Sequence, residues 1–210
     1  MKNIKIGIID LKLNNIYSIF QACKNIGYKT HVITNNKKSF MTYDIIILPG
    51  VGSYKKGMNY IKMKGIDDNI LEFSLKKNKL IFGICLGMQL LLKNSEEFGD
   101  TKGLNLVDGE VKILDKKKCK IIPHIGWSKI SKTTNNKIFN KKTGNDLYYF
   151  VHSYYCKLKD KNNIIAKTNY NNFEFCCAFN YKNIIGTQFH PEKSGNSGLK
   201  ILKNLSTLIK

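Results

Sequence analysis

Arginine is absent from this chain of 210 residues, so its 35 lysine-or-arginine positions are all lysines. Proteins that recognise base edges rely heavily on the planar guanidinium group, which lysine does not reproduce. The lysines are also scattered among asparagine-rich loops and helix faces. We therefore interpret the net charge of +20 as a solvated basic surface, with nucleic-acid binding as the less favoured alternative.

Long apolar runs are lacking as well. No stretch of about eighteen apolar residues that could span a membrane occurs, and the opening MKNIKIGIID resembles a strand rather than a signal peptide. The sequence thus predicts no membrane partner and a cytoplasmic location. Hydrophobic residues make up 42% and charged residues 24%, as in ordinary globular proteins. Residues 1–210 are expected to form one domain with a buried core.

Metal-binding patterns are missing too. No C-x-x-C pair occurs, and the spacing of the cysteines to the four histidines matches no zinc site. We expect reduced, mostly buried thiols and neither a metal nor a cofactor. The six cysteines lie at positions 23, 85, 119, 156, 176 and 177.

The order of apolar segments predicts an α/β protein. In the first half, apolar strands alternate with amphipathic helices, which is typical of a doubly wound, mostly parallel sheet. Short strands with few helices follow, which predicts an antiparallel or mixed extension, and an amphipathic helix comes last. The strands are expected at residues 4–10, 30–34, 43–48, 80–84, 109–115, 148–155, 164–169, 173–179 and 184–189, and the helices at 14–27, 55–63, 66–77, 86–92 and 195–209.

The central stretch KLIFGICLGMQLLL contains the strongest candidate for a reactive group. Cys85 lies between Gly83 and Gly87, where an apolar strand runs directly into an apolar helix. G-I-C-L-G is the cysteine form of the G-x-S-x-G nucleophile elbow, a sharp turn that exposes its central side chain. Amide groups of the new helix can stabilise the thiolate. The alternative is a buried, inert cysteine beside a flexible turn.

A cysteine nucleophile needs a base, and the base needs an orienting group. His124 and His152 stand in apolar surroundings and could serve as the base, but His190 in QFHPE is the better candidate. It follows a predicted strand, and Pro191 favours an extended backbone before it. Residues i and i+2 of an extended segment point the same way. Glu192 can therefore orient His190, which completes a Cys85–His190–Glu192 triad.

A glycine-rich segment, Pro49-Gly50-Val51-Gly52-Ser53, follows another predicted strand. It does not fit the nucleotide-binding patterns, because these require glycine where Lys55 stands or lysine where Met58 stands. Its backbone N–H groups, with that of Leu86, are better suited to stabilise a tetrahedral oxyanion. A plain loop is the alternative.

Five motifs together resemble the class I glutamine amidotransferases. They are PGVGSYKKGM, GICLGMQLLL, IPHIGWSKI, YFVHSYY and QFHPEKSG, and they span nearly the whole chain. The elbow and H-P-E segments are typical of the class. The other three resemble the glutaminase subunits of imidazole glycerol phosphate synthases of histidine biosynthesis.

The resemblance implies an enzyme that hydrolyses L-glutamine through a thioester on Cys85 and passes the ammonia to a (β/α)8-barrel cyclase subunit in a heterodimer. It implies an oxyanion hole at Gly52 and Leu86. Free subunits of this kind are expected to be slow until the partner organises the glycine-rich strip. The implied substrate contacts are Gly50, Gln89, Glu97, Ser153 and Tyr154, and the implied partner surface includes Trp127, Tyr148 and Lys193.

One position departs from the family pattern: Ser128 stands where HxGW is usually followed by asparagine. The predicted triad does not involve this residue, but the departure leaves a second partner pathway open. Supply of ammonia for amidination of a surface sugar is therefore one alternative. A cysteine peptidase-like hydrolase and a nucleic-acid-binding protein are remoter ones.

Overall fold

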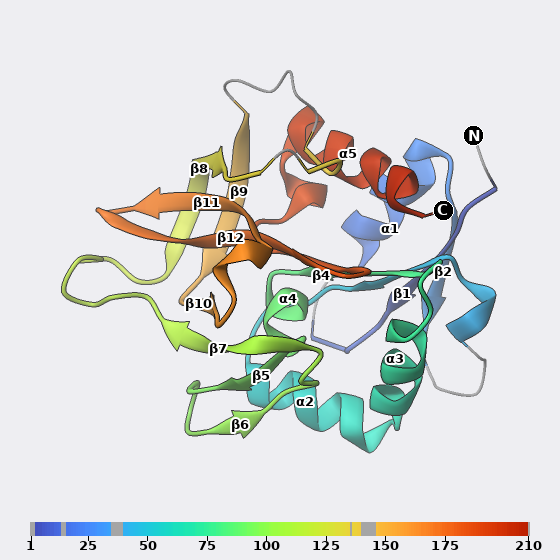
Figure 1. The fold of residues 1–210 in the computed structure, drawn as a ribbon, viewed down its shortest axis with the longest axis horizontal. Helices are drawn as coiled ribbons and strands as arrows, with labels where there is room; N and C mark the ends of the chain where they lie inside the picture. Colours follow the sequence, from blue (N-terminus) through green and yellow to red (C-terminus); the bar gives the residue numbers. More distant parts are fainter. Residues whose placement is uncertain (1–2, 14–15, 35–39, 135, 140–145, 210) are drawn as a thin grey trace.

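The computed structural model describes residues 3–13, 16–34, 40–134, 136–139 and 146–209. One mixed sheet passes through the molecule in the order β2-β1-β3-β4-β13-β12-β10-β7-β5-β6, with β11, β8 and β9 branching from β12 (Figure 1). The strands are β1 (Lys5–Ile9), β2 (Lys29–Ile33), β3 (Ile45–Leu48), β4 (Leu80–Ile84), β5 (Leu92–Ser95), β6 (Thr101–Lys102), β7 (Val107–Ile113), β8 (His124–Lys132), β9 (Leu147–His152), β10 (Tyr154–Leu158), β11 (Ile164–Tyr170), β12 (Phe173–Tyr181) and β13 (Ile184–Thr187).

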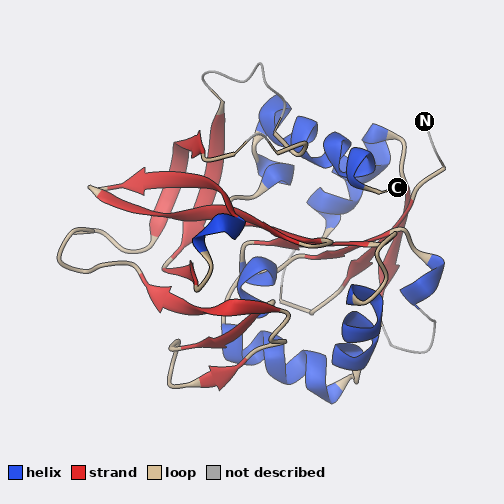
Figure 2. Cartoon of the chain, in the orientation of Figure 1, coloured by secondary structure: helices blue, strands red, loops and turns tan. Residues whose placement is uncertain are grey.

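Helices cover both faces of the parallel part of the sheet (Figure 2). Helices α1 and α5 lie on one face, and α2, α3 and α4 lie on the other (Figure 1). This arrangement confirms the predicted α/β class with a mixed sheet. The helices are α1 (Tyr17–Ile26), α2 (Tyr54–Met63), α3 (Ile66–Ser74), α4 (Leu86–Leu90) and α5 (Gly195–Asn204). Among the described residues, no helix has the length and apolar character to cross a membrane.

Each central strand contributes side chains to two hydrophobic cores, one on each face of the sheet. In β3, Ile45 and Ile47 pack with α1 and α5, whereas Ile46 and Leu48 pack with α2, α3 and α4. Successive side chains of a strand point to opposite faces, so a parallel strand covered on both faces must be apolar at every position. This explains the unbroken run IIIL in β3.

The second half of the chain forms the antiparallel part of the sheet, as predicted, but several boundaries differ. The predicted helix at 86–92 ends at Leu90, and β5 begins at Leu92. The predicted strand at 148–155 is divided at Ser153 into β9 and β10, and β8 was not predicted at all. The last predicted helix ends as α5 at Asn204 and continues as a short 3-10 helix. The first two residues of the predicted helix at 14–27 lie outside the described residues.

The pairing of β4 with β13 brings distant parts of the chain together. These strands are parallel neighbours, with Ile84 opposite Thr187. The N–H of Cys85 continues the pairing by donating to the carbonyl of Thr187 over 2.7 Å. The residues that follow β4 and β13 therefore leave the sheet side by side at the carboxyl ends of the strands. Open α/β sheets bind their ligands at this end.

Candidate active site

Cys85 occupies a strained turn between β4 and α4. Its backbone angles are φ 52° and ψ −108°, a conformation that costs free energy for a residue with a side chain. The two neighbouring glycines make the turn possible. A Cβ at Gly87 would lie 1.6 Å from the carbonyl oxygen of Leu48, and one at Gly83 would lie 2.8 Å from the backbone of Met88. The predicted elbow geometry is therefore present.

His190 and Glu192 form a buried pair beside this turn. Nδ1 of His190 lies 2.8 Å from Oε1 of Glu192, and the two side chains are 3% and 9% exposed. His190 is extended, as Pro191 predicts, although Pro191–Lys193 then form a 3-10 turn instead of continuing the strand. The carboxylate still reaches the ring.

The charge of the His190 ring depends on its two neighbours, Cys85 and Glu192. Burial by itself lowers the pKa of His190, but the neighbouring sulfur of Cys85 and the carboxylate of Glu192 outweigh this effect and raise the pKa to about 10. Nε2 of His190 is buried and, apart from the neighbouring sulfur of Cys85, has no hydrogen-bond partner among the described residues. A buried, unpaired nitrogen beside a thiol can accept its proton or deliver one to a substrate.

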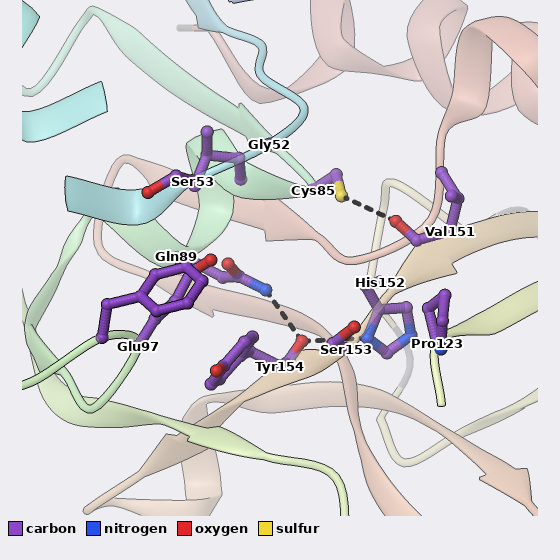
Figure 3. A pocket seen from close by; sticks show the side chains of 12 residues that line it. Gly52, Ser53, Cys85, Gln89, Glu97, Pro123, Val151, His152, Ser153 and Tyr154 are labelled. Carbon is purple, nitrogen blue, oxygen red and sulfur yellow. Dashed lines mark hydrogen bonds between the residues drawn. The ribbon is translucent and has the colours of Figure 1, made fainter. Parts of the chain in front are cut away.

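The sulfur of Cys85 opens into a cavity of about 360 Å³ (Figure 3). The Cys85 thiol lies 3.8 Å from the carbonyl oxygen of Val151, and Nε2 of Gln188 donates to the sulfur over 3.6 Å. The cavity is lined by Gly52, Ser53, Cys85, Leu86, Gln89, Glu97, Phe98, Pro123, Val151, His152, Ser153 and Tyr154. A free amino acid is of a size that such a space can hold.

Four predicted substrate contacts, Gln89, Glu97, Ser153 and Tyr154, meet in the wall of this cavity. Nε2 of Gln89 donates to the carbonyl of Tyr154 over 2.8 Å. Oε2 of Glu97 accepts from the N–H of Tyr54 over 2.7 Å. Burial raises the pKa of Glu97, although this hydrogen bond acts in the opposite direction. Carboxylate and amide groups thus stand opposite the candidate nucleophile.

The glycine-rich strip separates two cavities. Gly52, with φ +100°, borders the larger one together with Leu86. Gly50 instead borders a second cavity of about 130 Å³ that also contacts His190 and Lys193. The N–H of Leu86 donates to the carbonyl of Gly50 over 3.3 Å. One donor of the predicted oxyanion hole is therefore already engaged, and a substrate oxyanion must displace Gly50.

The predicted partner residues have different environments. Trp127 is 53% exposed on β8, and Lys193 is exposed with its Nζ 5.9 Å from the centre of the Tyr149 ring. Tyr148 is only 1% exposed and packs on Phe189, with ring centroids 4.3 Å apart. The side chain of Tyr148 therefore faces the core and not the expected partner surface, because alternate residues of β9 face the core.

Two polar residues of the site escaped the sequence argument. Gln188 bonds to the sulfur of Cys85, and its position two residues before His190 was a usable signal. His152, considered only as an alternative base, lines the cavity and forms a pair with His124 instead. Ser53, Phe98 and Val151 gave no comparable signal, because a serine, an aromatic or an aliphatic residue alone identifies no site.

Comparisons with known proteins agree with this geometry. The family model "Glutamine amidotransferase class-I" matches residues 7–207. The chain belongs to the class I glutamine amidotransferases. Among curated relatives of this amidotransferase, "Imidazole glycerol phosphate synthase subunit HisH" of Sulfurimonas denitrificans is 41% identical, covering 96% of this chain and 97% of the relative. Subunit HisH 1 of Methanococcus maripaludis is 40% identical, covering 97% and 100%.

Solved structures show that the amidotransferase also shares its fold with more distant proteins. PurLQS of Thermotoga maritima superposes with a TM-score of 0.78 at 19% identity, covering 99% of this chain and 100% of that one. A glutamine amidotransferase of the same organism gives a TM-score of 0.70 at 18% identity, covering 100% of both chains. At this level of identity the likeness concerns the fold alone.

Proposed function

We propose that this chain is the glutaminase subunit of an imidazole glycerol phosphate synthase. It hydrolyses L-glutamine to L-glutamate and ammonia, and it delivers the ammonia to a (β/α)8-barrel cyclase subunit. The observation that carries the proposal is the strained Cys85, which borders an amino-acid-sized cavity and has the buried His190–Glu192 pair as its neighbour. The HisH relatives, similar over nearly their full length, support the same function.

The reaction follows from these groups. The thiolate of Cys85 attacks the side-chain amide carbon of glutamine, and the His190 imidazolium protonates the departing nitrogen, which leaves as ammonia. The thioester that remains is hydrolysed by water, from which His190 takes a proton. Collapse of the second tetrahedral intermediate releases glutamate and restores the thiolate. Glu192 orients His190 and stabilises its charged form.

The substrate is held by its two ends in this proposal. Glu97 is suited to the α-amino group, because its carboxylate borders the cavity and is partly desolvated. The backbone of Ser153 and Tyr154 is suited to the α-carboxylate. Gln89 holds this backbone in place, because its Nε2 donates to the carbonyl of Tyr154 and to Gln188, and its free oxygen can accept from the α-amino group. At the reacting end, Gly52 and Leu86 would stabilise the oxyanion once the Leu86–Gly50 hydrogen bond opens. That requirement supports slow turnover by the isolated chain.

Glutamate release from glutamine, followed with the purified chain alone and with its partner, tests the activity. Turnover abolished by alkylation of Cys85 is expected. Hydrolysis of casein with indifference to glutamine would instead identify a peptidase.

The partner belongs to the same proposal. Trp127 is exposed on β8 together with Ile125, which is 59% exposed, and large exposed apolar side chains are typical of interaction surfaces. Purification of the tagged chain should bring down a barrel cyclase, and the chain should rescue a histidine auxotroph that lacks this subunit. Recovery of a sugar-modifying enzyme, with no rescue, would assign the glutaminase to the other pathway.

A further inference from the structure

Two histidines outside the candidate triad form a buried pair. Nδ1 of His124 lies 3.1 Å from Nε2 of His152, and the residues are 1% and 6% exposed. The ring of His124 stacks between Tyr170 and Phe150, with centroids 4.1 and 4.8 Å away. A pair so enclosed has a fixed geometry, and its hydrogen bonds can be assigned one by one.

The outer nitrogens of the pair also have partners. Nδ1 of His152 lies 2.9 Å from the carbonyl oxygen of Tyr154, and Nε2 of His124 lies 2.9 Å from Oγ of Ser128. These hydrogen bonds form a continuous network, Ser128–His124–His152–Tyr154, with Ser128 at its outer end and Tyr154 at its inner end. It begins at a half-buried residue on β8 and ends at the wall of the larger cavity.

The direction of every hydrogen bond in this network follows from its inner end, the carbonyl of Tyr154. The carbonyl of Tyr154 can only accept, so Nδ1 of His152 carries a proton. Burial lowers the pKa of His124 to about 4, and burial together with His124 lowers that of His152 to about 3, so both rings are neutral near pH 7. Nε2 of His152 then accepts from Nδ1–H of His124, and Ser128 donates to Nε2 of His124.

The inner end of the network, at Tyr154, lies in the wall of the larger cavity. The carbonyl of Tyr154 accepts from Nε2 of Gln89 over 2.8 Å as well as from His152, and these interactions surround the corner at Ser153 (Figure 3). Gln89 in turn contacts Gln188 over 3.2 Å, and Gln188 bonds to the sulfur of Cys85. The position of this corner is thus connected to the candidate nucleophile by polar contacts.

The outer end of the network, at Ser128, lies beside the exposed side chain of Trp127 on β8. Ser128 follows Trp127, and β8 pairs with β9 such that His124 stands opposite His152. The two histidines are therefore neighbours across two adjacent strands.

We propose that His124 and His152 are positioning residues for glutamine, which hold the Ser153–Tyr154 corner against the substrate cavity and connect it to Ser128. This inference rests on the proposed glutaminase function. The alternative is a structural pair that stabilises the core without affecting how glutamine is held.

The first test measures the protonated nitrogens directly. The chain has four histidines, so 15N spectra of the full-length protein labelled at histidine can be assigned with single His→Phe variants. We expect neutral His124 and His152, both protonated at Nδ1 instead of at the Nε2 position that free histidine prefers. Protonation at Nε2 in either ring would overturn the inference, whatever reaction the protein catalyses.

The second test compares two reagents that alkylate Cys85. The glutamine analogue 6-diazo-5-oxo-L-norleucine needs the amino-acid site, whereas iodoacetamide needs only the thiol. In His152→Phe and His124→Phe, labelling by the analogue should fall by about tenfold, as expected for loss of a buried hydrogen bond. Labelling by iodoacetamide should stay within about twofold of wild type. Intact-mass spectrometry follows both reactions.

Conservative variants distinguish positioning from packing. His152→Asn can still donate to Tyr154 from its amide nitrogen, and it should recover most of the analogue labelling. At the outer end, Ser128→Asn supplies another donor to His124 and should behave like wild type, whereas Ser128→Ala should show a smaller loss than the Phe variants.

Three labelling results would also contradict the inference. They are wild-type analogue labelling in both Phe variants, an equal loss with both reagents, and no recovery in His152→Asn. In the wild type, glutamine should protect Cys85 from the analogue. Absence of that protection would overturn the glutaminase function itself, and the positioning role with it.

Discussion

Nδ1 of His190 lies 2.8 Å from Oε1 of Glu192 in surroundings that exclude most solvent. The pair is held at the point where β13 gives way to a 3-10 turn, directly beside the turn that carries Cys85. Electrostatic stabilisation of a charged imidazolium is strong there, because water screens the pair poorly. The reactivity proposed for Cys85 depends on this pair.

Replacement of Cys85 by alanine should abolish glutamine hydrolysis while the fold is retained. Loss of one member of a catalytic unit typically costs several orders of magnitude in turnover. Steady-state assays and circular dichroism give the two readouts. Cys119→Ala removes another buried thiol and should leave turnover near wild type. Substantial residual activity in Cys85→Ala would mean that the nucleophile is a different residue.

Glu192→Gln should reduce turnover less than His190→Ala does. The glutamine side chain can still contact Nδ1 of His190 and orient the ring, although it no longer stabilises the imidazolium. His190→Ala removes the proton carrier itself. Turnover numbers measured at saturating glutamine give the comparison. The opposite order would assign the proton transfer to Glu192.

The stability contributed by His190 should depend on pH. Cys85 and Glu192 together raise its pKa from 6.5 to about 10 in the fold, so their interactions with the charged imidazolium stabilise the native state fully below pH 6.5. This contribution is lost as the pH rises through the folded pKa. The free energy of unfolding of wild type relative to His190→Gln should therefore decrease from pH 6.5 to about 10. Urea titrations at both ends of this window provide the check, and a constant difference would contradict the raised pKa.

Gly87→Ala should prevent formation of the elbow. The added Cβ would lie 1.6 Å from the carbonyl oxygen of Leu48. Because both atoms belong to backbone, the clash can be relieved only if α4 moves away from β3. We expect a loss of about 3 kcal/mol or more in the free energy of unfolding. Gly27→Ala is the matched control: its φ of +98° costs only about 1 kcal/mol, because open space surrounds the site. Thermal melts of both variants should differ clearly.

Glu97→Gln should raise the KM for glutamine and change kcat little. The substitution preserves shape but removes the negative charge proposed for the α-amino group, an interaction that the ground state and the transition state share. Glu96→Gln is the control, since Glu96 instead accepts from the N–H of Ile113. An unchanged KM in Glu97→Gln would show that another group holds the amino end.

Partner binding should be visible in the fluorescence of Trp127, the single tryptophan of the chain. Its side chain is about half exposed, so burial by a partner should shift the emission to shorter wavelength. Trp127→Ala should weaken association by about tenfold to a hundredfold, as for a central aromatic contact. Binding without any spectral change would place the interface elsewhere.

The central sheet and the elbow could be predicted because their signals are local. Apolar runs such as IIIL identify parallel strands, and Gly83 and Gly87 stand where backbone crowding permits no side chain. The His190–Glu192 pairing was likewise predicted from a spacing of two residues. In each case the signal lies within a few residues of sequence, even where the crowding comes from a distant segment, as Leu48 does at Gly87.

The antiparallel part was predicted less well, because its hydrophobic pattern is inverted or hidden. In β8, the polar His124 is buried while Ile125 and Trp127 are exposed. The alternation of apolar and polar residues would therefore predict the exposed face of β8 to be the buried one. The corner at Ser153 carries neither glycine nor proline, and three successive leucines conceal the end of α4. The engaged Leu86–Gly50 hydrogen bond depends on contacts between segments that no local pattern records.

The parallel pairing of β4 with β13 has a consequence for biosynthesis of the protein. Because the thiol and the imidazole occupy the ends of strands separated by about a hundred residues, a growing chain carries Cys85 long before its proton acceptor exists. In the proposed mechanism, Cys85 gains its proton acceptor only when β13, one of the final strands to leave the ribosome, has paired with β4. An unfinished chain would therefore lack the base that the proposed hydrolysis of glutamine requires.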